Sequence, residues 1–115
     1  MTQFRFHAKR LFDGQNFIDD QVLTISHGVI SAIDQNTNDV DVKATGLVVP
    51  GYIDLQVNGG GGALFNGSPS VAKLQTILAA HAKFGTPSLM PTIIPDQVAA
   101  MEQAAAAKYE AISQK

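Results

Sequence analysis

The sequence has 115 residues, a formal net charge of −2, and no cysteine. Its composition, 45% hydrophobic and 16% charged, includes no basic stripe that would favour nucleic acid or an anionic membrane. The absence of cysteine excludes disulfides and cysteine-based zinc sites. No signal peptide and no apolar run of about 20 residues is visible, so we expect a cytoplasmic protein.

Residues 3–34 have the pattern of β-strands. Apolar and polar side chains alternate over residues 4–9, which indicates a half-buried strand. Residues 13–16, DGQN, are typical of a turn. Two apolar runs joined by a short link containing glycine predict a hairpin over residues 22–33. Residues 34–45 are rich in Asp and Asn, and we expect them to form a loop.

The stretch at residues 48–62, VVPGYIDLQVNGGGG, is the most informative part of the chain. On a β-strand, Asp54, Gln56 and Asn58 would share one face and the apolar side chains between them the other. Gly59, Gly60, Gly61 and Gly62 then follow, and glycine can adopt positive φ and allow a close backbone approach. The stretch therefore predicts a strand that delivers polar side chains to a site.

The rest of the chain alternates between helix and strand. Ser68 and Pro69 are a suitable start for a helix over residues 69–84, and Gly85 is a suitable stop. A short strand over residues 88–90 and a helix over residues 96–112 are predicted next. The expected apolar stripe of the second helix comprises Val98, Met101, Ala105 and Ile112. The alternation argues for parallel βα units.

The run Pro50-Gly51-Tyr52-Ile53-Asp54, followed by alternating polar residues, resembles the first barrel strand of the amidohydrolase superfamily. The common form there is P-G-x-I-D-x-H-x-H, and Gln56 and Asn58 stand in place of its two metal-binding histidines. This departure, with the glycines that follow, is similar to one branch of the N-acetylglucosamine-6-phosphate deacetylases. The pairs Phe65-Asn66 and Gly85-Thr86 and the run at 89–92 fit as well. Pro87 departs from the small hydroxyl residue that is usual there.

The resemblance implies an α/β fold in two parts. Residues 1–47 would form the N-terminal part of a small β-sandwich, and residues 48–115 the first two βα units of an incomplete (β/α)8 TIM-type barrel. Sixty-eight residues follow Leu47, whereas a complete barrel needs roughly 250. The resemblance thus implies the N-terminal segment of a larger enzyme.

For function, the resemblance implies hydrolysis of the acetamide of N-acetylglucosamine 6-phosphate, giving glucosamine 6-phosphate and acetate. The full enzyme would use one divalent metal, zinc or similar, and the segment alone would bind none and be inactive. No catalytic residue or metal ligand is assigned within it. The expected substrate is an amino-sugar phosphate, and neither nucleic acid nor a membrane is an expected partner. We expect the chain to form a homo-oligomer, because unpaired strand edges and exposed apolar stripes favour association.

The resemblance also suggests roles for individual residues. Gln56 and Asn58 would lie in the vicinity of the metal site, although their amide oxygens are weaker ligands than imidazole. The alternative without a function is that both are polar side chains on a solvated strand end. Asp54 would support the site as an acceptor for backbone donors. Thr92 and the four glycines would line the pocket. For the glycines alone, a plain flexible loop is the more conservative hypothesis.

His7, His27 and His81 lack the spacing of a metal site, so we expect surface or packing roles. Two rival functions stay open. One is another metal-dependent amidohydrolase, such as a cyclic-amide hydrolase, although those relatives keep both histidines. The other is a non-catalytic binding or interaction module, which would hold if the gene ends at residue 115.

Overall fold

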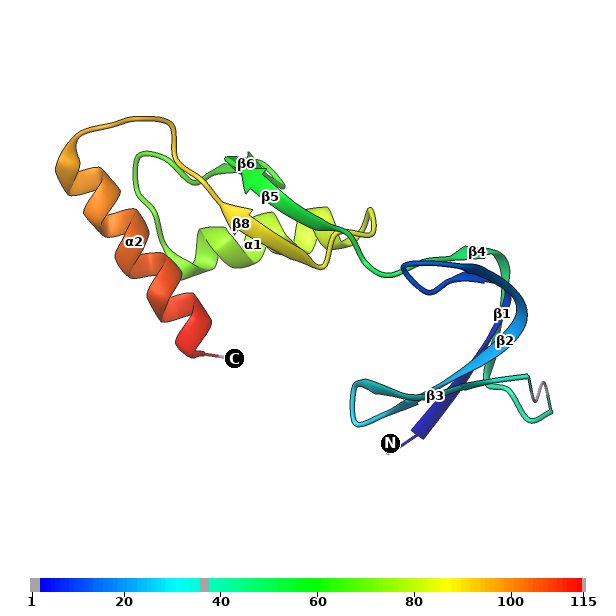
Figure 1. The fold of residues 1–115 in the computed structure, drawn as a ribbon. Coiled ribbons are helices and arrows are strands. Elements are labelled where there is room, and N and C mark those ends of the chain that lie inside the picture. The colour runs from blue at the N-terminus through cyan, green and yellow to red at the C-terminus, as the bar shows by residue number, and fades with distance from the viewer. Residues whose placement is uncertain (1–2, 36–37, 115) are drawn as a thin grey trace. The chain divides into compact units, whose positions relative to one another are not determined.

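The computed structural model describes residues 3–35 and 38–114. The chain divides into two compact units, Met1–Pro50 and Gly51–Lys115, and each unit is described by itself. The first contains a four-stranded sheet, and the second contains two βα units (Figure 1).

The sheet of the first unit has the strand order β3-β2-β1-β4. Strands β1 (Gln3–Phe12) and β2 (Phe17–Ser26) form an antiparallel pair, and β3 (Val29–Asp34) continues it on the β2 side. Strand β4 (Val42–Val48) runs parallel to β1. The predicted strands and hairpin are therefore present.

One expectation in this unit is wrong. The segment at 34–45 was expected to be a loop, but β4 already begins at Val42. Strand β4 forms because it pairs with β1, which provides the backbone hydrogen bonds. The local sequence of residues 42–45 does not predict this pairing. Residues 36 and 37 of the expected loop lie outside the described residues.

A small apolar cluster stabilises the sheet. Ala8, Leu11 and Leu23 are buried together, and Phe6 and Val48 pack against them. The β1–β2 turn is closed by Asp13, whose Oδ1 accepts hydrogen bonds from the amides of Asn16 and Gln15 over 2.7 and 2.8 Å. These bonds lower the pKa of the Asp13 carboxyl group below its usual value.

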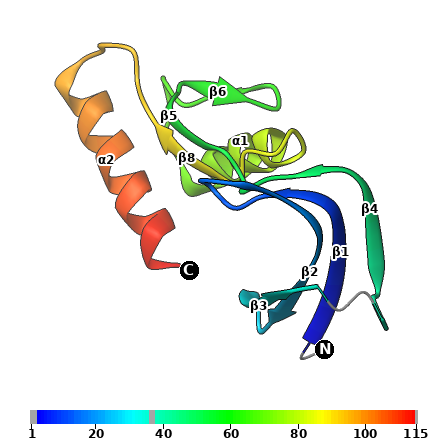
Figure 2. The same cartoon turned by 45° about the vertical axis from the view of Figure 1, so that its right-hand side comes forward.

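In the second unit, strands β5 (Ile53–Val57) and β8 (Ser88–Pro91) pair in parallel. They lie side by side in both views, with α1 (Val71–Ala82) connecting them in the sequence (Figure 1, Figure 2). Two short strands, β6 (Gly59–Gly60) and β7 (Ala63–Leu64), form a hairpin between β5 and α1. Helix α2 (Val98–Ser113) follows β8.

The start of α1 differs from the predicted one. Ser70, rather than Ser68, is the N-cap, and its side chain accepts a hydrogen bond from the amide of Lys73 over 3.3 Å. The helix therefore begins at Val71 and not at residue 69. Gly85, the predicted stop, has φ +88°, a backbone conformation that glycine adopts without strain.

The packing face of α2 is also different from the predicted one. Ala104 and Ala107 are the buried side chains, with Ala111 packed beside them. Val98, Met101 and Ile112 of the expected stripe are exposed. Small alanine side chains allow α2 to pack closely on the core around Phe65, Leu74 and Ile77, so the larger residues turn outward. Neither helix of the described residues is long and apolar enough to cross a bilayer.

Candidate functional site

The carboxyl ends of β5 and β8 bring two predicted site residues together. Because the strands are parallel, the residues that follow them meet at the same edge. Asn58 follows β5, and its Nδ2 donates a hydrogen bond to the carbonyl oxygen of Thr92 over 3.1 Å. The amide of Thr92 in turn donates to the carbonyl of Val57 over 2.9 Å. Asn58 thus joins the two strand ends through its Nδ2. Its Oδ1 can still accept a hydrogen bond.

The hydroxyl group of Thr92 has no hydrogen-bond partner among the described residues. Its Oγ1 is buried and makes no hydrogen bond within the described residues. A hydroxyl group is both donor and acceptor, and a buried polar group usually has a partner. This oxygen therefore has unused hydrogen-bonding capacity at the strand ends.

Gln56 and Asp54 are linked within β5. The Gln56 amide donates to Asp54 Oδ1 over 3.0 Å, at a place where the pairing of β5 with β8 shifts register between Asp54 and Val57. The carboxylate accepts a backbone donor where the ladder is irregular. Asp54 is half-buried, whereas Gln56 is exposed. The Gln56 side chain therefore remains free to face whatever lies at this edge.

The glycines form a defined hairpin rather than the plain flexible loop that was the conservative expectation. Gly59 and Gly60 pair with Leu64 and Ala63 as β6 and β7. The turn between them has positive φ at both central positions, +60° at Gly61 and +80° at Gly62. This is the conformation of a type I′ turn, which favours glycine.

Two residues to which the sequence analysis gave no role in the site, His81 and Asn66, hold this region in place. His81 Nε2 lies 3.0 Å from the carbonyl oxygen of Gly59, and Asn66 pairs with the backbone of Ile94. Neither has a spacing that reveals its partner. His7 lies in the first unit, where its Nε2 is 3.5 Å from Asp20 Oδ1, and His27 is exposed beside Ser26.

The described residues do not provide a complete set of ligands for a metal ion. Within residues 3–35 and 38–114 no group of three or more His, Cys, Asp or Glu side chains could hold one. The amide oxygens of Gln56 and Asn58 are weak ligands by themselves. The residues present therefore do not fit a resident metal ion on their own.

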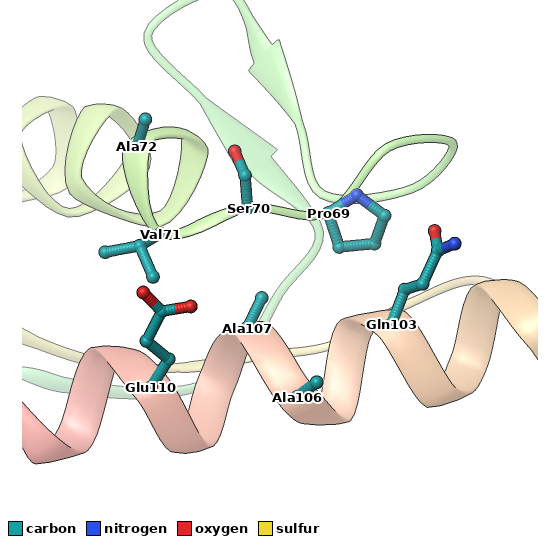
Figure 3. Close-up of a pocket in the computed structure, with 8 residues that line it drawn as sticks. All are labelled: Pro69, Ser70, Val71, Ala72, Gln103, Ala106, Ala107 and Glu110. Carbon is teal, nitrogen blue, oxygen red and sulfur yellow. The ribbon is translucent and has the colours of Figure 1, made fainter.

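A cavity between the two helices lies away from the strand ends. It has a volume of about 460 Å³ and lies between the beginning of α1 and the middle of α2 (Figure 3). Its lining comprises Pro69, Ser70, Val71, Ala72, Gln103, Ala106, Ala107 and Glu110. None of the predicted site residues borders it, so it is separate from the candidate site.

No protein-family model matches the chain. Its sequence is 37% identical over 113 residues to an N-acetylgalactosamine-6-phosphate deacetylase of Shewanella sp. (strain ANA-3), covering 91% of this chain and 28% of the relative. The chain therefore spans less than a third of the length of this relative.

Solved structures agree with the fold. The N-acetylglucosamine-6-phosphate deacetylase of Pasteurella multocida superposes with a TM-score of 0.84 at 26% identity, over 98% of this chain and 31% of that one. A mutant of the Mycobacterium smegmatis enzyme, solved in complex with N-acetyl-D-glucosamine-6-phosphate, superposes with a TM-score of 0.84 over 99% of this chain and 30% of that one. Its 15% identity shows the fold alone.

The four-stranded sheet followed by two βα units matches the N-terminal region of these deacetylases. The resemblance carried by Pro50-Gly51, Asp54, Gln56 and Asn58 is confirmed by these relatives, which match most of the chain. The chain belongs to the N-acetylhexosamine-6-phosphate deacetylases of the amidohydrolase superfamily, and it corresponds to their N-terminal segment.

Proposed function

We propose that this chain is the N-terminal segment of a deacetylase that hydrolyses the acetamide of N-acetylglucosamine 6-phosphate, in the cytoplasm, as a step of amino-sugar catabolism. The observation that carries the proposal is the strand β5 with its Gln56 and Asn58, in a chain related to known deacetylases over 91% of its length. In this proposal β5-α1 and β8-α2 are the first two βα units of a (β/α)8 barrel, and residues 1–47 contribute to a β-sandwich.

The strand ends define what this segment would do. Active sites of such barrels lie at the carboxyl ends of the strands, which is where Asn58 and Thr92 are joined. Asn58 and Gln56 would line the neighbourhood of the metal site, and Thr92 and the glycine hairpin the adjoining wall of the pocket. Asp54 would support β5 through the Gln56 amide.

One divalent metal ion, zinc or similar, would serve the complete enzyme. Such an ion supplies Lewis-acid chemistry for hydrolysis when bound. Since the described residues of this chain lack a donor cluster, the ligands and the catalytic acid–base group would come from other parts of the enzyme. The contribution of this segment is therefore to orient and enclose the substrate.

N-acetylgalactosamine 6-phosphate is the second candidate substrate. Two relatives, 37% and 34% identical to this chain, are named as deacetylases of that sugar phosphate, whereas the Pasteurella multocida and Haemophilus influenzae relatives are named for the glucosamine form. The two sugars differ in the configuration of one hydroxyl group. The described residues include no feature that distinguishes them.

The test is acetate release from each sugar phosphate by the gene product at its full encoded length. We expect turnover, with the higher kcat/KM on N-acetylglucosamine 6-phosphate. Asn58→Ala should lower kcat/KM by about 10–100-fold, whereas Gln75→Ala, an exposed position on α1, should leave it unchanged. A preference for the galactosamine form would select the second candidate, and absence of turnover on both would refute the proposal.

A further inference from the structure

His81 connects α1 to the residue that directly follows Asn58. Its Nε2 lies 3.0 Å from the carbonyl oxygen of Gly59. Because a carbonyl oxygen can only accept, Nε2 must carry the hydrogen and donate it. The side chain is half-buried on the helix face that contacts the β6–β7 hairpin. His81, for which the lack of metal-site spacing predicts a surface or packing role, therefore makes a directed contact beside the candidate site.

The same imidazole occupies the space next to Gly60. A Cβ atom at Gly60 would lie 2.8 Å from His81 Nε2 and 2.9 Å from its Cδ2, which is closer than real Cβ contacts. At Gly61 a Cβ would lie 3.1 Å from the Thr76 carbonyl oxygen and 3.1 Å from Ala80 Cβ. The hairpin thus rests directly on α1, and glycine makes this approach possible.

The contact fixes a segment that is otherwise easy to deform. Four consecutive glycines have more backbone freedom than any other residues. The Asn58 carbonyl accepts a hydrogen bond from the Phe65 amide over 2.8 Å, which closes the hairpin on itself. Among the described contacts, the His81 bond is the one that joins this closed hairpin to the helix through a hydrogen bond.

We propose that His81 is a positioning residue for Asn58: it holds the Gly59 peptide on α1 and so sets the backbone from which Asn58 reaches the strand ends. The importance of Asn58 for turnover rests on the proposed function. The positioning itself concerns contacts within this chain and can be tested separately.

Hydrogen exchange measured by mass spectrometry on the 115-residue chain tests the positioning. His81→Phe keeps the aromatic ring but removes the donor, and we expect exchange in peptides covering residues 57–66 to rise about five- to tenfold. His81→Gln retains an N–H donor and should restore most of the protection. Gln75→Ala, exposed on the same helix, is the matched control and should leave exchange unchanged.

Peptides of β1 and β2 are the internal reference, since they belong to the other unit. Unchanged exchange over 57–66 in His81→Phe would overturn the proposal, as would exchange in His81→Gln equal to that in His81→Phe. An equal rise over α1, β8 and α2 would also overturn it, because it would show general loss of folding. In the full-length gene product, His81→Phe should lower kcat more than it alters KM, with rescue by Gln. A wild-type protein without turnover would refute the proposed function and leave the exchange result standing.

Discussion

Asn66 and Ile94 are 28 positions apart in the sequence, and they exchange two hydrogen bonds. Asn66 Nδ2 donates to the Ile94 carbonyl oxygen over 2.9 Å, and the Ile94 amide donates to Asn66 Oδ1 over 3.0 Å. The side-chain amide therefore pairs with a peptide group as a second strand would. It joins the segment after the glycine hairpin to the segment after β8.

Replacement of this amide should weaken the second unit. Asn66→Ala removes both hydrogen bonds, and we expect a loss of about 1–2 kcal/mol in the free energy of unfolding. Asn66→Asp keeps the acceptor for the Ile94 amide and should cost less. Urea denaturation compares the variants with Gln75→Ala, and equal midpoints for Asn66→Ala and the control would contradict this account.

Gly59 of the hairpin should tolerate alanine far less well than Gly46, which lies in β4 of the other unit. A Cβ at Gly59 would lie 2.5 Å from the Ala63 carbonyl oxygen, a backbone atom that cannot move aside easily. We expect Gly59→Ala to cost more than about 2 kcal/mol, whereas Gly46→Ala, with no atom within 4 Å of its Cβ, should change stability by less than about 0.5 kcal/mol. Thermal unfolding followed by circular dichroism measures both, and similar shifts for the two variants would contradict the hairpin geometry.

The 115-residue chain by itself should not release acetate from either sugar phosphate. Its described residues bring Asn58 and Thr92 together but offer no cluster of metal-binding side chains, and a barrel site is built from several strands. The assay uses the purified chain with added zinc at high enzyme concentration. Turnover near that of an intact relative would show that the site is more complete than the contacts indicate.

Histidines at the two amide positions should create a second metal site in the full-length gene product. Neutral imidazole is a better ligand than a carboxamide, so Gln56→His with Asn58→His should raise the metal content from one to two ions per subunit. The same change removes the Asn58 bond to Thr92, so a small loss of stability should accompany it. Elemental mass spectrometry gives the count, Gln56→Ala with Asn58→Ala serves as control, and two ions in the unmodified protein would contradict the single-metal proposal.

The isolated chain should associate with copies of itself. Ile53 and Leu55 on β5 are 70% and 67% exposed, and Val98 and Ile112 on α2 are 66% and 56% exposed. Apolar surface of this extent favours association. We expect a homo-oligomer in sedimentation experiments at low micromolar concentration, shifted toward monomer by Ile112→Glu but not by Gln75→Glu. A compact, cooperatively folding monomer of the unmodified chain would contradict this expectation.

The sequence alone determined the elements whose signals are local. The alternation in residues 4–9 and the Gly-containing link at 26–28 indicated the β1–β2–β3 region, and the order of strand and helix after residue 48 indicated two parallel βα units. The motif from Pro50 to Asn58 indicated the family, and relatives that match most of the chain confirm it. In each case the information lies within a few neighbouring residues.

The tertiary structure alone decided which distant residues meet. Strand β4 begins at Val42 because β1 is there to pair with it, and α2 packs through Ala104 and Ala107 rather than through its larger side chains. The bonds from Asn58 to Thr92 and from His81 to Gly59 span 34 and 22 positions. No local pattern specifies such pairs, since they depend on how closely the backbones can approach, and here glycine and alanine set that distance.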